Sequence, residues 1–102
     1  MTVKICGMIH LNVLLTVKDE KDVPEIRNLL AEQGRLSRQE PGCARFEVYH
    51  SQKDSRVFIL HEWWESQAAL EVHRTAKAYT QIYQPRVLPK VDRVPHPASM
   101  IE

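Results

Sequence analysis

The sequence predicts an α+β fold in which an antiparallel four-stranded sheet carries helices on one face. Apolar and polar side chains alternate over residues 5–17, which is the period of a strand with one buried face. Residues 23–38 instead repeat apolar side chains at helical spacing. Residues 43–51 and 57–64 alternate again, and the short polar loop between them favours an antiparallel hairpin. The first half of the chain therefore reads as strand, helix, strand, strand.

Turn and capping residues predict where the first helix begins and ends. Asp22 is predicted to be its N-cap, with Pro24 tolerated in the first turn. Gly34 is expected to mark a bend or a break in this helix. The run Glu40-Pro41-Gly42 ends the helix and turns the chain into the next strand.

The second half of the chain predicts one more helix and one more strand. Ser66 is expected to cap a helix that runs to about residue 78. Residues 78–83 either continue it or begin a second short helix, which ends before Pro85. Residues 90–94 suggest a brief last strand, and the proline-rich sequence after it predicts an extended tail of about eight residues. This order is the split βαβ, ferredoxin-like pattern.

Length and composition fit a small globular protein. The 102 residues suit a single domain over positions 1–102. A net charge of +1, from 14 basic and 13 acidic residues, argues against nucleic acid as a partner. No apolar run approaches the ~20 residues that a bilayer span needs, so no membrane contact is expected. We expect a cytoplasmic protein in which Cys6 and Cys43 are free thiols.

The face of the sheet turned away from the helices predicts a homodimer. It should carry two large apolar side chains that are costly to expose, together with polar ones. Its expected members are His10, Asn12, Leu14, His61 and Trp63. Two such sheets packed face to face would cover these side chains in a symmetric dimer.

Three stretches of the chain together resemble the antibiotic biosynthesis monooxygenase family. They are EPGCARFEVYHS, FILHEWWES and the later ALEVH, and the resemblance covers about residues 9–91. It implies a dimeric α+β barrel. It also implies a choice of activities, because the family includes cofactor-independent oxygenases of quinols and aromatic polyketides, haem-degrading enzymes, enzymes that process small sugar-derived signals, and members with no demonstrated activity.

Two titratable residues are the candidate catalytic groups. Glu62 shares parity with buried positions of its strand, so it is predicted to be either a pocket acid or base, or a structural partner of His73 or of the amides at the Ser66 helix start. His73 is predicted to be either a base for a phenolic substrate or a half-buried imidazole held by Glu62 or a carbonyl.

Aromatic and apolar neighbours of these residues are the candidate substrate-binding groups. Trp64, Phe58 and Leu60 are expected to line a cavity, although simple core packing is the alternative for each. Tyr79 and Tyr83, four residues apart, are expected near its mouth or else in ordinary helix packing. Lys77 either binds an anionic group or is solvated.

The family resemblance, together with these candidate residues, implies a cofactor-independent monooxygenase that uses molecular oxygen on a small electron-rich aromatic such as a quinol. The alternatives are a non-oxidative isomerase or processing enzyme and a non-catalytic ligand-binding dimer. No flavin, nicotinamide or metal motif is visible, so no cofactor or metal is expected. Haem degradation is disfavoured because Asn12, which would be the family's strand asparagine, has the parity of the open face.

Overall fold

The computed structural model describes residues 7–102, so Ile5 and Cys6, at the start of the predicted first strand, lie outside the described residues. The order of the main elements is the predicted one. The elements are β1 (Ile9–Val17), a 3₁₀ turn η1 (Glu20–Asp22), α1 (Val23–Ser37), β2 (Cys43–His50), β3 (Val57–Trp64), α2 (Gln67–His73), a π-helix η2 (Ala78–Val87), a 3₁₀ turn η3 (Leu88–Lys90) and β4 (Val91–Ala98).

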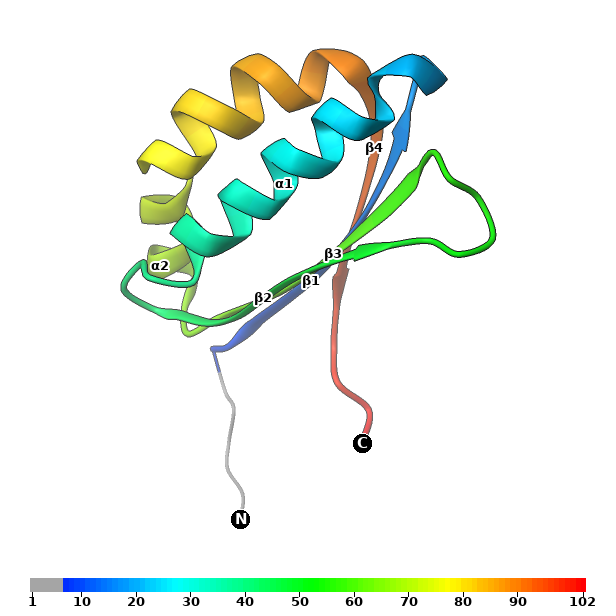
Figure 1. Cartoon of the computed structure of the whole chain (residues 1–102). Coiled ribbons are helices and arrows are strands. Elements are labelled where there is room, and N and C mark those ends of the chain that lie inside the picture. The colour runs from blue at the N-terminus through cyan, green and yellow to red at the C-terminus, as the bar shows by residue number, and fades with distance from the viewer. Residues whose placement is uncertain (1–6) are drawn as a thin grey trace.

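The four strands form one antiparallel sheet in the order β2-β3-β1-β4. The helices α1 and η2 lie side by side over one face of this sheet, and the short α2 lies near one end of α1 (Figure 1). The predicted α+β, ferredoxin-like architecture is confirmed. Within residues 7–102, the helices are too short or too polar to cross a membrane.

The core lies between the helices and the inner face of the sheet. Burial alternates along β1, where Val13 and Leu15 are fully buried while Leu14 between them is 40% exposed. The same alternation places Phe58, Leu60, Glu62 and Trp64 on the inner face of β3. Because side chains of a strand alternate between faces, the predicted parity of both strands is confirmed.

Asp22 holds the predicted N-cap position of α1, but its side chain makes no capping hydrogen bond. Asp19, not Asp22, accepts a capping bond, from the Lys21 amide at 3.1 Å. Asp19 is the N-cap of the preceding 3₁₀ turn η1 and has the extended backbone that is typical of this position. The backbone of Asp22 is already helical, and its carboxylate lies 3.7 Å from Lys90 Nζ. Pro24 occupies the first turn as expected.

Gly34 neither bends nor breaks α1, which continues through it to Ser37. A Cβ atom at this position would lie 3.2 Å from Arg38 Nη1 and 3.4 Å from Val48 Cγ2. The glycine therefore allows a close approach of the helix to β2.

The second half of the chain has a shorter helix and a longer strand than predicted. Ser66 caps α2 as expected, but α2 ends at His73, and η2 continues through Pro85. Proline disfavours an α-helix, and here the chain takes the wider π turn, in which the Leu88 amide bonds to the Tyr83 carbonyl five residues earlier. The strand β4 extends to Ala98, so only residues 99–102 remain as a tail. Prolines are accommodated because β4 is an edge strand, where every second backbone N–H points away from the neighbouring strand.

Candidate functional site

The structure brings His73 and Trp64 together beneath the helices. His73 is the last residue of α2, and Trp64 is the last residue of β3. Their ring centroids are 4.3 Å apart, and the imidazole also lies near the rings of Phe46 and Tyr79, at 6.0 and 5.7 Å. Trp64 is fully buried and His73 is 3% exposed, so the imidazole lies in a largely apolar, aromatic surrounding.

The acidic partner of His73 is Glu40 and not Glu62. The distance from His73 Nδ1 to Glu40 Oε1 is 2.7 Å, and the Glu40 side chain is mostly buried. A carboxylate can only accept, so Nδ1 carries the proton and Nε2 of the neutral imidazole keeps its lone pair. Burial lowers the pKa of His73 below its ordinary value, and the Glu40 carboxylate opposes this shift. The neutral imidazole with a free Nε2 is the form of a general base.

Glu62 forms a second polar contact in the same layer. Its Oε1 accepts a hydrogen bond of 2.9 Å from Trp64 Nε1, and the residue is 5% exposed. Its neighbours across the sheet are Leu11 on β1 and Phe46 on β2. Burial raises the pKa of Glu62 to about 7, although the Trp64 hydrogen bond and the positive charge of Arg93 act against the shift. This carboxyl group can therefore exchange a proton near neutral pH.

The two predicted tyrosines lie on η2 beside this cluster. Tyr79 is half-buried next to His73, and its ring centroid is 5.4 Å from that of Tyr83. The Tyr83 hydroxyl accepts a hydrogen bond of 3.0 Å from Arg93 Nε on β4. Burial raises the pKa of Tyr83 to about 12, so its hydroxyl keeps its proton.

The structure does not bring Phe58 next to His73. Phe58 lies six positions before Trp64 on β3, which at ~3.3 Å per residue separates them by roughly 20 Å. Its ring stacks on His50 at 4.2 Å, and it lines a different pocket. Leu60 is fully buried between Val13 and Val48, where it forms part of the central core.

Sequence reasoning missed Glu40 as a member of the site. The available signal was an acidic residue directly before the Pro-Gly turn that opens β2. Its partner is 33 positions further along the chain, and only the docking of α2 onto this turn brings the two together.

Other polar residues lie outside the cluster. Asn12 bonds to His61 on the open face of the sheet, so its predicted orientation away from Trp64 is confirmed. Burial raises the pKa of the Cys43 thiol to about 11, which keeps it protonated and weakly nucleophilic. Within residues 7–102, no three His, Cys, Asp or Glu side chains are grouped to hold a metal ion.

The sheet order and the one-sided helical layer define the class of small ferredoxin-like α+β proteins. The chain belongs to the antibiotic biosynthesis monooxygenase family, whose model matches residues 8–84.

Three known proteins are similar to this chain in sequence or in fold. The uncharacterized protein YjcS of Bacillus subtilis (strain 168) is 28% identical over 71 residues, which cover 70% of this chain and 68% of YjcS. A conserved protein of unknown function from Bacteroides thetaiotaomicron VPI-5482, described as a possible oxidoreductase, superposes with a TM-score of 0.83 at 23% identity, covering 90% of this chain and 96% of that one. A point mutant of SnoaB from Streptomyces nogalater, described as a cofactor-independent oxygenase, superposes with a TM-score of 0.80 at 9% identity, covering 94% and 95%. At these identities the two structures show a shared fold.

Proposed function

We propose that this protein is a cofactor-independent monooxygenase of a small electron-rich aromatic, such as a hydroquinone. The observation that carries the proposal is the buried imidazole of His73, whose Nδ1 lies 2.7 Å from Glu40 Oε1 and whose ring lies against Trp64. Family membership supports the reaction class, and the cofactor-independent oxygenase SnoaB has the same fold.

In this proposal, His73 Nε2 takes the proton of a phenolic hydroxyl. The resulting phenolate is electron-rich enough to pass an electron to molecular oxygen, so the substrate itself is the reductant. A hydroquinone and one O₂ give a hydroxyquinone and one water, which balances atoms and electrons. The surrounding Trp64 and Phe46 rings keep water from the reactive intermediates.

The second carboxyl group of the cluster has a separate part in the proposal. Glu62 is close to half-protonated near neutral pH because burial raises its pKa to about 7. It therefore serves as the group that returns a proton when the oxygen–oxygen bond breaks and water leaves. Trp64, whose indole N–H holds this carboxyl group, positions it.

Substrate would enter where the cluster is least covered. Trp64 and His73 are buried, whereas Tyr79 and Glu40 are only partly so. Tyr79 lies beside the imidazole of His73, but it belongs to η2, whereas His73 belongs to α2. We assign Tyr79 as the side chain that swings aside to admit an aromatic ring onto Trp64.

The test is oxygen uptake by the purified protein with a panel of hydroquinones, corrected for autoxidation. His73→Gln removes the base and is expected to lower kcat/KM by about 10²–10⁴-fold. Glu40→Gln removes the charge that raises the pKa of His73, so the acid limb of the pH profile of kcat/KM should move to lower pH. Glu32→Gln, the same change at an exposed position of α1, should leave rate and profile unaltered.

Two results would count against the assignment. Unchanged uptake in a folded His73→Gln variant would remove His73 from the reaction. An acid limb that stays in place in Glu40→Gln would show that Glu40 does not act through the imidazole.

A second candidate function is ligand binding without catalysis. The close packing of the cluster, in which Trp64, His73 and Tyr83 are all buried, argues against turnover there, whereas a separate pocket between α1 and β2 offers space for a ligand. Absence of uptake above autoxidation for every hydroquinone would favour this candidate. A non-oxidative isomerase is less well supported, because the Glu62–His73 pair that would suit it is replaced by two separate contacts.

A further inference from the structure

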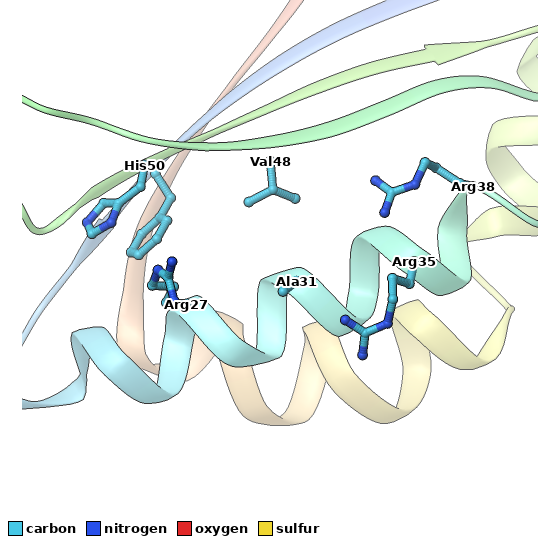
Figure 2. A pocket seen from close by; sticks show the side chains of 7 residues that line it. Arg27, Ala31, Arg35, Arg38, Val48 and His50 are labelled. Atoms are coloured by element: carbon cyan, nitrogen blue, oxygen red, sulfur yellow. The ribbon is translucent and has the colours of Figure 1, made fainter.

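A pocket of about 390 Å³ lies between α1 and β2. Figure 2 shows Val48 pointing from the strand into this space, with Arg27 and His50 at one end and Arg38 at the other. Arg27, Ala31 and Arg35 follow one another at intervals of four residues, so they share one side of the helix. The lining residues are Arg27, Ala31, Arg35, Arg38, Val48, His50 and Phe58.

The positive charge of this pocket is not neutralised within the described part of the chain. The ion pairs found in residues 7–102 involve other basic groups, not the three arginines of the pocket. Arg38 donates from Nη1 to the Phe46 carbonyl at 2.8 Å, which fixes the guanidinium without cancelling its charge. Arg27 and Arg38 therefore bring positive charge to the two ends of this space, and Arg35 lines it from α1.

His50 adds a fixed ring at the same end as Arg27. Its Nε2 donates to the Ser55 carbonyl at 2.7 Å, and its ring stacks on Phe58 with an interplanar angle of 12°. These two contacts leave Nδ1 as the remaining polar atom of the ring. At the other end, Gly34 brings α1 close to β2 and narrows the space near Arg38.

We propose that this pocket binds a small organic carboxylate. Guanidinium groups recognise carboxylates with paired, charge-assisted hydrogen bonds. The side chains of Val48, Ala31 and Phe58 form the apolar part of the lining. An inorganic anion would leave this apolar surface in contact with water. A ligand with both a carboxylate and a compact apolar body uses both parts of the lining.

The site is separate from the His73 cluster. Phe58 belongs to the pocket and Trp64 to the cluster, and the two lie near opposite ends of β3. Binding at the pocket can therefore be measured without reference to oxygen chemistry.

The experiment is a titration of ¹⁵N-labelled protein with benzoate, followed by amide chemical shifts and by calorimetry. Saturable shifts are expected in residues 27–38 and 46–50. Arg27→Gln and Arg35→Gln should each raise Kd about tenfold, the size expected for one charge-assisted contact. Ala31→Met, which fills the pocket without changing its charge, should abolish binding.

Three controls make the assignment specific. Arg86→Gln removes a positive charge from the exposed side of η2 and should leave Kd unchanged. Benzamide, a neutral analogue of benzoate, and inorganic sulfate should each bind much more weakly.

Several outcomes would overturn the proposal. They are the absence of saturable shifts with benzoate, shifts confined to other elements, and a Kd that is unaltered in the two arginine variants. Equal affinity for sulfate would overturn the organic ligand, and equal affinity for benzamide would overturn the recognition of charge.

Discussion

Glu62 places a carboxyl group at a position of β3 where the strand pattern predicts a buried apolar side chain. Its neighbours on the same face of β3 are Leu60 and Trp64, both fully buried. The hydrogen bond from Trp64 to its side chain does not offset the loss of water, so burial raises the pKa of Glu62 to about 7. The residue is therefore tolerated when protonated and is destabilising when ionised.

This pKa predicts how stability depends on pH. The folded state binds more protons than the unfolded state between the unfolded pKa, 4.5, and about 7, so the free energy of unfolding should fall as pH rises through this window. Glu62→Gln keeps an acceptor for Trp64 but removes the charge. It should match the wild type near pH 4 and be more stable by roughly 3 kcal/mol at pH 8.

Urea denaturation at several pH values measures this difference, with Glu65→Gln as the exposed control that should show none. A constant difference between wild type and Glu62→Gln across the pH range would mean that Glu62 is not buried as described.

At the level of elements, the docking of α2 onto the start of β2 assembles the site. Gly42 has φ = +82°, a conformation that favours glycine, and a Cβ atom there would lie 2.5 Å from Ala69 Cβ. The Gly42 carbonyl also accepts a bond of 2.8 Å from the Glu65 amide. This close contact holds α2 where His73 can reach Glu40.

Gly42→Ala should therefore destabilise the protein through both strain and a steric clash. Left-handed strain of ~1–2 kcal/mol and overpacking of ~1–3 kcal/mol predict a loss of about 3 kcal/mol in the free energy of unfolding. Gly7→Ala is the matched control, because Gly7 also has a positive φ, +92°, but apart from its chain neighbours no atom of the described residues lies within 4 Å of its Cβ position. The free energy of unfolding of Gly7→Ala should fall only by the contribution of left-handed strain, ~1–2 kcal/mol.

Thermal and urea unfolding measure the loss of stability in Gly42→Ala and in Gly7→Ala. Adding Ala69→Gly to Gly42→Ala should recover part of the loss, since it removes the atom that clashes. Equal losses for Gly42→Ala and Gly7→Ala would show that the contact between the turn and α2 is not tight.

At the level of the whole molecule, the open face of the sheet carries an apolar row across all four strands. Strand pairing places Tyr49 beside Ile59, Ile59 beside Leu14, and Leu14 beside Val94. Tyr49, Leu14 and Val94 are 51%, 40% and 50% exposed. On the same face, Trp63 Nε1 is buried without a hydrogen-bond partner within the described residues. A second copy of the sheet would cover these groups, which is why we expect a homodimer.

Leu14→Glu should convert this dimer to monomers, because the two-fold axis brings the buried charge into the interface twice. A rise in the dimer Kd of at least about a hundredfold is expected in sedimentation velocity experiments. Val72→Glu alters another exposed apolar side chain, on α2, and should leave the dimer intact. A monomeric wild type, or a Leu14→Glu variant that remains dimeric, would contradict the face-to-face arrangement.

The sequence by itself determined the element order and the face on which each strand residue lies. A period of two or of 3.6 residues is a local property, and it separates Glu62 and Trp64 from Trp63 and Asn12 without any tertiary information. The ends of elements were predicted less accurately. Pro85 did not end its helix, and β4 continues through two prolines.

Only the tertiary structure decided which polar groups meet. His73 contacts Glu40 and not Glu62 because α2 docks on the Pro41-Gly42 turn, a contact between segments about 30 residues apart. The arginine pocket likewise depends on the separation of α1 from β2, which no spacing in the sequence encodes. Periodicity fixes the direction of a side chain relative to its own element, whereas its partner depends on how elements pack.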